Sequence, residues 1–356
     1  MDRLLKIREK LAQKNLDGVL ITDGKNQLYA TGFAFTDGAV LITRERAFLF
    51  TDSRYIEAAE KTVSADFGLR LFGAGKRLSE LIKAELKSCA VKSLGAEEFS
   101  LPHGQYLNYE KLLGLELTPC QSIFYELRAS KDEQELVHMR AAQAIAEKAL
   151  DDVLRIIRPG VTERDIAAEI TYRLLKHGGE GNSFDPIAVS GANSSMPHGV
   201  PSDKPVENGD FVTMDFGCVK NGYCSDMTRT VAVGYATEEM KNVYDVVLRA
   251  QLEGIKTARA GVSGAAIDGA ARKVISDAGF GEYFGHSFGH SLGLDIHESP
   301  SASPSSRAPM PAGAVISAEP GIYLPGKFGV RIEDVLILRE DGCENITHAN
   351  KELIIL

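Results

Sequence analysis

The sequence predicts an α+β protein of two domains, the second of which is a duplicated unit with pseudo-twofold symmetry. Three observations favour this fold class: a length of 356 residues, a change near residue 125 from short strand-like runs to long helical stretches, and an internal repeat. A chain of this length is long for one hydrophobic core and comfortable for two. The expected domains are residues 1–125, a small α/β unit, and residues 126–356.

Composition and charge narrow the classes of function. Apolar residues make up 44% of the chain and charged residues 25%, as in an ordinary globular protein. The formal net charge of -9 disfavours binding to nucleic acid or to an anionic membrane surface. We expect no secretory leader, because nothing near Met1 combines a basic start with an apolar run, and no membrane span, because no run of about 18 apolar residues occurs. The five cysteines show no CxxC spacing, which favours reduced thiols in a cytoplasmic protein.

The first domain is expected to have a structural or oligomerisation role. The strand-like runs 39–43 and 47–51 flank a polar triplet, which is typical of a hairpin. Asp52 then occupies a helix N-cap position ahead of a helical pattern that starts at Tyr55. This region contains no cluster of candidate catalytic groups.

The second domain contains the internal repeat. A long helical stretch over 132–157 opens the domain, and Arg-Pro-Gly-Val-Thr follows at 158–162. This motif recurs as Arg-Ala-Gly-Val-Ser at 259–263, and the segment 209–217 recurs at 313–321 with an acidic residue in the equivalent position. A period this long, present only twice, excludes a solenoid. It favours two related halves with a functional site between them.

Two acidic residues are expected to meet on the first hairpin of this domain. Its strands are joined through Asn221-Gly222, the strongest short signal for a two-residue type I′ turn. That turn places Asp226 opposite Gly217, so Asp215 and Asp226 share one face as diagonal neighbours. Two carboxylates on an apolar strand surface repel each other unless a proton or a cation lies between them.

The second half supplies two more acids, Glu319 and Glu333, on consecutive strand-like runs. For their side chains to face each other directly, the loop must have an odd number of residues, which makes 325–327 its members. A two-residue loop would put them on opposite faces. His290 and His297 lie between the two hairpins in sequence.

Four carboxylates and one imidazole suit a pair of divalent ions such as Mn²⁺, Co²⁺ or Zn²⁺. The absence of plausible cysteine ligands argues against a structural zinc site. Taken singly, an aspartate in a hairpin is more often solvent-facing, and a histidine in a glycine-rich stretch is more often a loop or core residue. The matched acids of the repeat favour the metal site over these alternatives.

These segments resemble the creatinase, prolidase and methionine aminopeptidase family over essentially the whole chain. The segment 286–298, His-Ser-Phe-Gly-His-Ser-Leu-Gly-Leu-Asp-Ile-His-Glu, is similar to the signature of its proline-specific peptidases. The other matching segments are 26–33, 52–55, 196–199, 203–205, 214–217, 225–228, 318–321 and 331–334. The resemblance implies a pita-bread catalytic domain, preceded by the smaller creatinase/prolidase-type domain. Ser291 departs from the pattern, since many members have glycine there, and its hydroxymethyl group could narrow the cleft.

The resemblance also implies the roles of individual residues. The metal ligands correspond to Asp215, Asp226, His290, Glu319 and Glu333. The residues of the substrate cleft and the partners of the ligands correspond to His198, His297, His286, Arg331 and Phe184. Asp226 and Glu333 would bridge the two ions, and Arg331 would orient a bridging carboxylate. His198 and His297 would position the scissile carbonyl.

The implied reaction is hydrolysis of the peptide bond before proline at the N-terminus of a dipeptide or short peptide. Two ions per subunit, expected to be Mn²⁺ and roughly 3.5–4 Å apart, would activate a bridging water, with Glu319 as its general base. No motif separates a dipeptidase from an aminopeptidase. The family also implies a homodimer in which the first domain of one subunit caps the neighbour's cleft. The alternatives are a methionine-aminopeptidase-like or broader aminopeptidase, a metal-free creatinase-like hydrolase and an inactive binding module.

Overall fold

The computed structural model describes residues 3–356, which form two compact units. The first unit runs to Leu127 and the second spans Arg128–Leu356. The expected boundary between residues 125 and 126 lies two residues before this division. Within residues 3–356, every helix is too short or too polar to cross a lipid bilayer.

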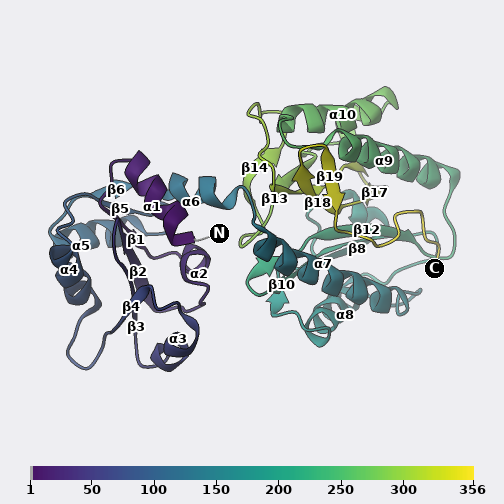
Figure 1. The fold of residues 1–356 in the computed structure, drawn as a ribbon. Helices are drawn as coiled ribbons and strands as arrows, with labels where there is room; N and C mark the ends of the chain where they lie inside the picture. Colours follow the sequence, from purple (N-terminus) through teal and green to yellow (C-terminus); the bar gives the residue numbers. More distant parts are fainter. Residues whose placement is uncertain (1–2) are drawn as a thin grey trace. The chain divides into compact units, whose positions relative to one another are not determined.

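The first unit is a six-stranded mixed sheet with helices around it (Figure 1). The strand order is β4-β3-β2-β1-β5-β6, and the predicted hairpin is confirmed as the antiparallel pair β2 and β3. The strands are β1 Gly18–Ile21, β2 Gly38–Thr43, β3 Ala47–Thr51, β4 Phe67–Leu71, β5 Leu94–Ala96 and β6 Leu117–Pro119. The helices are α1 Arg3–Gln13, α2 Gly24–Thr31, α3 Ile56–Thr62, α4 Leu78–Ser88, α5 His103–Leu113 and α6 Gln121–Arg128.

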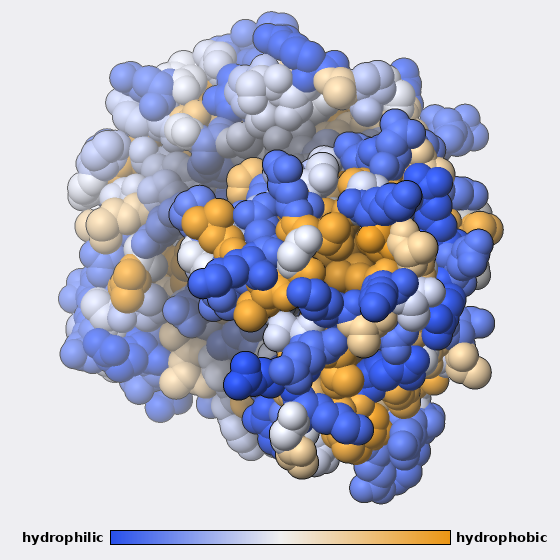
Figure 2. Space-filling view, turned by 90° about the vertical axis from the view of Figure 1, so that its left-hand side faces the viewer, coloured by the Kyte–Doolittle hydropathy of each residue, from blue (hydrophilic) through white to orange (hydrophobic). Residues whose placement is uncertain are grey.

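One face of this sheet packs on α4, where Ile82 and Leu86 contact the apolar core of the strands. Other apolar side chains of the unit are exposed, and Figure 2 shows hydrophobic groups in orange among hydrophilic ones in blue on the face turned to the viewer. The large apolar residues exposed in this unit are Leu5, Leu71, Phe99, Leu107, Leu112 and Tyr125.

The predicted helix cap at Asp52 is wrong. Helix α3 begins at Ile56, with Tyr55 in the cap position and no side-chain cap. The Asp52 carboxylate instead accepts a hydrogen bond from the backbone N–H of Arg54 at 2.8 Å and pairs with the Arg54 guanidinium at 2.6 Å. A turn over residues 53–55 separates Asp52 from the first residue of the helix.

The second unit consists of two halves built from the same elements in the same order. Each half has a long helix, a shorter helix and antiparallel strands, and the strands of both halves lie between the two helix pairs (Figure 1). The helices are α7 Glu133–Leu154 and α8 Glu163–Lys176 in the first half, and α9 Glu238–Thr257 and α10 Gly264–Asp277 in the second. Two buried apolar clusters, one centred on each helix pair, form the core.

The strands of the two halves form separate sheets, with the orders β12-β9-β8 in the first half and β14-β13-β15-β18-β19 in the second. Those of the first half are β7 Gly181–Asn182, β8 Ile187–Ser190, β9 Phe211–Phe216, β10 Cys218–Lys220, β11 Tyr223–Cys224 and β12 Met227–Ala232. Those of the second half are β13 Gly289–Ser291, β14 Glu298–Ala302, β15 Val315–Ala318, β16 Gly321–Leu324, β17 Phe328–Arg331, β18 Asp334–Arg339 and β19 Gly342–Asn345. Short 3₁₀ turns cover Gly191–Ser195 and Gly281–Tyr283.

The duplication extends to helix caps and single hydrogen bonds. Helices α8 and α10 each have 14 residues and begin after a hydroxyl cap, Thr162 in one and Ser263 in the other. The backbone N–H of Gly160 donates to the Val206 carbonyl at 2.9 Å, and the equivalent N–H of Gly261 donates to the Met310 carbonyl at the same distance. The pseudo-twofold repeat predicted from the sequence is therefore confirmed.

Candidate metal centre

The first hairpin has the predicted turn. Asn221 and Gly222 form its two-residue loop, with positive φ values of 51° and 79°, as a type I′ turn requires. The same register continues to Asp215, which pairs with Thr228. Asp226 lies two residues before Thr228, so the carboxylates of Asp215 and Asp226 project to the same face.

The second hairpin has the predicted three-residue loop. Leu324 pairs with Phe328, which leaves 325–327 as the loop. The pairs on either side of the acids keep one register, which places Glu319 directly opposite Glu333. Glu319 directly follows β15 and Glu333 directly precedes β18, so both lie where regular strand pairing is interrupted.

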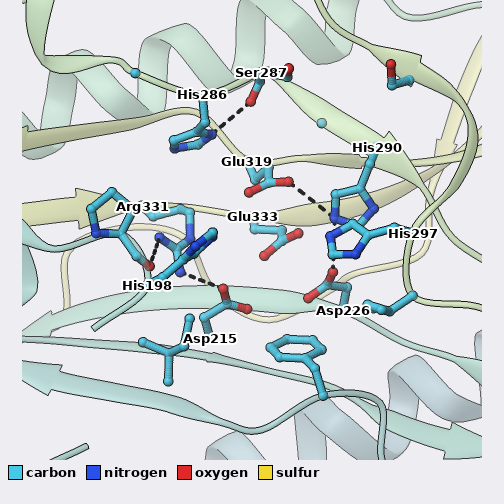
Figure 3. A pocket seen from close by; sticks show the side chains of 17 residues that line it. His198, Asp215, Asp226, His286, Ser287, His290, His297, Glu319, Arg331 and Glu333 are labelled. Atoms are coloured by element: carbon cyan, nitrogen blue, oxygen red, sulfur yellow. Dashed lines mark hydrogen bonds and ion pairs between the residues drawn. The ribbon is translucent and has the colours of Figure 1, made fainter. Parts of the chain in front are cut away.

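All ten residues expected at the site line one cavity of about 680 Å³ between the two halves. The carboxylates and His290 point toward its centre, whereas His198 lies on the side of Arg331 and His297 on the side of His290 (Figure 3). The ten are Phe184, His198, Asp215, Asp226, His286, His290, His297, Glu319, Arg331 and Glu333. The remaining wall consists of Ile187, Pro197, Gly285, Ser287, Gly289, Ile296 and Ser301.

The donor atoms are close enough to share a metal ion. Asp226, His290 and Glu333 each offer one ligand atom, and these atoms lie within 4.8 Å of one another. Nε2 of His290 is 3.5 Å from Oδ2 of Asp226 and 3.4 Å from Oε1 of Glu319.

Three carboxylate oxygens of this cluster are buried without a hydrogen-bond partner among residues 3–356: Asp215 Oδ1, Asp226 Oδ1 and Glu333 Oε1. A buried polar atom with no partner costs free energy, and a buried charge costs more. A divalent cation among these oxygens removes that cost, so the donor set fits a metal ion.

Burial sets the electrostatics of the cluster. It raises the pKa of Asp226 and of Glu333 well above the usual carboxyl range, and the neighbouring carboxylates add to both shifts. Burial also raises the pKa of Glu319. The pKa of His290 is lowered by burial, which keeps the imidazole neutral and able to bind a metal. Without a cation, Asp226, Glu319 and Glu333 therefore bind their protons more tightly than free carboxyl groups do.

Neighbouring groups orient His290 for that role. Its Nδ1 lies 3.1 Å from the carbonyl of Ser291, so Nδ1 carries the hydrogen and the lone pair of Nε2 faces the carboxylates. The backbone N–H of His290 donates to Oγ of Ser317 at 3.0 Å, and the Ser317 hydroxyl donates to Glu319 at 3.0 Å. Ser317 was not among the expected residues. Because residues two apart on a strand face the same side, its position two residues before Glu319 could have indicated it.

Arg331 has a different partner from the one expected. The resemblance assigned it to a bridging carboxylate, but its Nη2 pairs with Oδ2 of Asp215 at 2.5 Å. One bridging candidate, Glu333, receives the Thr228 hydroxyl at 2.7 Å instead. Thr228 also accepts Nε of Arg331 at 3.0 Å, so a threonine lies between the guanidinium and Glu333.

Tyr323, which the sequence did not indicate, links Arg331 to His286. Its oxygen accepts from Nη1 of Arg331 at 2.8 Å and lies 2.9 Å from Nε2 of His286. Burial raises the pKa of Tyr323 to about 12, so the hydroxyl keeps its proton and donates it to His286. Nδ1 of His286 in turn lies 2.9 Å from the Ser287 carbonyl.

The segment that carries His297 is fixed by buried charges. Glu298 pairs with Arg128 and with Nζ of Lys131, the latter at 3.0 Å, and accepts the backbone N–H of Asp295 at 3.1 Å. Burial opposes ionisation of Glu298, but Lys131 and Arg128 outweigh it and lower the pKa of Glu298. The His297 ring packs edge-on against His290 with centroids 4.3 Å apart.

Ser291 does not narrow the cleft. It is fully buried and is absent from the residues that line the cavity. Its hydroxyl donates to the carbonyl of Pro300 at 2.5 Å, which directs the side chain into the protein.

The duplicated fold and its cluster of carboxylates and imidazole define a candidate metal-dependent hydrolase. Comparison with known families shows which family of hydrolases the chain belongs to. Metallopeptidase family M24 matches residues 137–340, and the Creatinase/Prolidase N-terminal domain matches residues 3–130. The chain belongs to metallopeptidase family M24, and it is an enzyme of the peptidase class with the pita-bread fold.

Similar proteins cover nearly the full length of the chain. An uncharacterized peptidase, YqhT, of Bacillus subtilis is 41% identical over 99% of this chain and 100% of its own. The structure of an Xaa-Pro dipeptidase from Bacillus anthracis is 39% identical with a TM-score of 0.96, covering 100% of this chain and 99% of that one. That of an X-Pro aminopeptidase from Thermotoga maritima is 36% identical with a TM-score of 0.93, covering 98% and 99%.

Proposed function

We propose that the chain is a dinuclear metallopeptidase that hydrolyses the bond before proline at the N-terminus of dipeptides or short peptides. One observation carries the proposal: five ligand-type side chains from two halves meet in a cavity where three carboxylate oxygens have no hydrogen-bond partner in the described part of the chain. The relatives named for Xaa-Pro substrates support the substrate class, because their similarity spans both units.

Five residues would hold two divalent ions, with Mn²⁺ expected first: Asp215, Asp226, His290, Glu319 and Glu333. When bound, such ions generate a nucleophile from water at neutral pH and polarise a carbonyl group. Arg331 holds Asp215 in place with a short ion pair, and Ser317 holds Glu319. The ligand geometry is thus fixed by the chain before a substrate arrives.

Glu319 is the proposed proton carrier. Its carboxylate faces the cavity, where it can take a proton from the attacking water and pass it to the nitrogen of the leaving proline. His198 and His297 would donate hydrogen bonds to the oxygen of the scissile carbonyl. Burial, with His290 and His198 nearby, lowers the pKa of His297, so its ring is neutral near pH 7 and has one N–H to offer.

The cavity wall suits the proline residue of a substrate. Proline has no backbone N–H and a fixed φ, so a site for it needs shape rather than a backbone acceptor. Phe184, Ile187, Pro197 and Ile296 give the cavity apolar surface beside the polar centre. We propose that this surface contacts the pyrrolidine ring.

A three-peptide assay tests the function. The Mn²⁺-loaded protein should hydrolyse Ala-Pro or Ala-Pro-Xaa far faster than Met-Ala-Xaa, and a chelator should stop the reaction. Cleavage of Ala-Pro alone identifies a dipeptidase, and cleavage of the longer peptide an aminopeptidase. Preference for Met-Ala-Xaa contradicts the proposal, and activity that survives removal of all bound metal contradicts its metal chemistry.

The homodimer remains a separate prediction. The family precedent assigns oligomerisation and cleft capping to the first domain, and the exposed apolar residues of that unit support it (Figure 2). Sedimentation equilibrium should give twice the chain mass of 38.6 kDa. A monomer at all concentrations would refute the prediction without affecting the metal site.

A further inference from the structure

His198 lies in an irregular segment, residues 191–202, between β8 and β9. The segment begins as a 3₁₀ turn over Gly191–Ser195 and then reverses at Met196, whose carbonyl accepts the N–H of Gly199 at 3.0 Å. The His198 side chain is exposed, and its ring has no hydrogen-bond partner within residues 3–356. The backbone of the segment therefore sets the position of this imidazole.

One buried carboxylate, Glu163 of α8, joins the two ends of this segment. Its Oε1 accepts the backbone N–H of Ser190 at 2.6 Å and the Ser190 hydroxyl at 3.0 Å. Its Oε2 accepts the backbone N–H of Ser202 at 3.1 Å and the Ser202 hydroxyl at 2.6 Å. The side-chain amide of Asn193 donates to both oxygens, at 3.0 and 3.2 Å.

The charge of Glu163 suits this arrangement. The side chain is fully buried and belongs to the first residue of α8, where the helix dipole favours a negative charge. Six hydrogen bonds from N–H and O–H donors saturate its oxygens, as an ionised carboxylate requires. Nζ of Lys204 lies 2.9 Å from Oγ of Ser190 and pairs with Asp210 at 2.7 Å, so its charge is shared with a second carboxylate.

The segment also contacts the metal centre. The carbonyl of Pro197, the residue before His198, accepts Nη1 of Arg331 at 3.2 Å. The backbone N–H of Gly329 donates to Oγ of Ser194 at 2.9 Å. These two contacts hold the middle of the segment to β17 independently of Glu163, which holds its ends.

The duplication shows that the fold does not require this carboxylate. The equivalent position in the second half is Gly264, the first residue of α10. A Cβ there would lie 2.2 Å from the carbonyl oxygen of Ser301, so no side chain fits. The hydrogen bonds of Glu163 to Ser190, Asn193 and Ser202 form a carboxylate clamp. This clamp is specific to the half that carries His198.

We infer that Glu163 is a positioning residue that fixes His198 by tying both ends of segment 191–202, an inference that rests on the proposed function. Glu163→Gln is the direct test. Each carboxylate oxygen accepts a backbone N–H, so the amide group of glutamine must face one of these donors. The segment then loses one anchor while the side chain keeps its size.

The kinetic test is a double-mutant cycle with Ala-Pro and Ala-Pro-Xaa as substrates. Glu163→Gln should lower kcat/KM about tenfold in the wild-type background but less than about twofold in the His198→Ala background. Metal content should stay unchanged. The matched control is Glu97→Gln in the first unit. Glu97 is equally buried and accepts the N–H groups of Thr22 and Asp23, so its loss should have the same effect in both backgrounds.

Hydrogen exchange tests the clamp without activity. Glu163→Gln should speed the exchange of amides within 190–202, and Glu97→Gln should not. Equal factors in the two kinetic backgrounds, or unchanged exchange, would overturn the inference. If the wild-type protein cleaves no peptide, the proposed function fails. The hydrogen-exchange experiment alone then tests whether Glu163 holds the segment. Ser202→Ala removes a single donor and serves if Glu163→Gln does not fold.

Discussion

The two hairpins that carry the carboxylates place their acids in different ways. The first has a two-residue loop, and Asp215 and Asp226 are diagonal neighbours on one face. The second has a three-residue loop, and Glu319 and Glu333 stand directly opposite each other. Sequence-equivalent strands in a duplicated fold therefore need not carry equivalent pairs. What both hairpins preserve is the face, because side-chain direction alternates along a strand.

The hairpins also differ in how their charges are balanced. Asp215 has a guanidinium partner in Arg331, whereas Glu319 and Glu333 accept hydrogen bonds from the hydroxyl groups of Ser317 and Thr228. Asp226 has neither kind of partner and, like Asp215 and Glu333, keeps one buried oxygen without a hydrogen-bond partner among residues 3–356. The second hairpin and Asp226 thus depend on bound cations more than Asp215 does. Substitutions at Asp226 and at Arg331 should therefore differ in their effect.

The largest effect is expected at Asp226, the buried acid without a cationic partner. Asp226→Asn should abolish turnover and weaken metal binding while the fold stays intact, because an amide cannot supply the lost negative charge. Bound metal, kcat/KM and circular dichroism check this. Asp277→Asn, an exposed aspartate at the end of α10, is the control and should behave as wild type. More than a few per cent activity with both ions bound would count against the bridging role.

A smaller loss is expected when the partner of Asp215 is changed. Arg331→Lys keeps the charge but loses the fork that contacts Asp215, Tyr323 and Thr228 together. We expect metal affinity or kcat/KM to fall about 10- to 100-fold. Arg339→Lys, at a half-exposed ion pair, should change neither by more than about twofold. An unchanged Mn²⁺ titration for Arg331→Lys would show that metal binding does not require Arg331 to orient Asp215.

Removal of metal should make stability depend on pH. The folded-state pKa values of Asp226 and Glu333 lie above their unfolded values, so the folded protein binds more protons in between. Stability of the metal-free protein should then fall as pH rises from about 4 through the raised pKa values. Thermal unfolding with chelator and with Mn²⁺, at about pH 5 and pH 7.5, measures this. A metal-free protein that gains stability over that range would contradict the charge assignment.

The smallest effect is expected at Ser291, which lies beside a ligand but outside the cavity. Ser291→Gly removes a buried hydrogen bond to Pro300 and should cost about 1 kcal/mol of unfolding free energy. Activity should change less than about twofold, because no cavity wall is altered. Denaturant unfolding and kcat/KM check the two statements. A large change in substrate preference would show that Ser291 does shape the substrate cleft.

The features that follow from local rules were predictable from the sequence. Asn221-Gly222 specifies its turn, alternation then fixes the face of Asp215 and Asp226, and matched motifs reveal the duplication. The convergence of Glu319 and Glu333 required only one further assumption, that they face each other. These inferences involve residues close in sequence or related by the repeat, where spacing carries geometric information.

The features that failed or were missed depend on which side chains reach one another in space. Asp52 pairs with Arg54 rather than capping α3, because two donors compete for one carboxylate. Arg331 reaches Asp215, 116 residues away, and no spacing encodes that choice. Tyr323 and Glu163 were missed for the same reason, since their roles arise from the packing of separate segments.

We propose that five side chains from the duplicated halves hold two divalent ions. Anomalous scattering from crystals of the Mn²⁺-loaded protein tests it most directly. Two peaks are expected in the cavity, both contacted by Asp226 and Glu333, with Asp215 at one and with His290 and Glu319 at the other. A single peak, or metal bound elsewhere with these side chains unengaged, would contradict it.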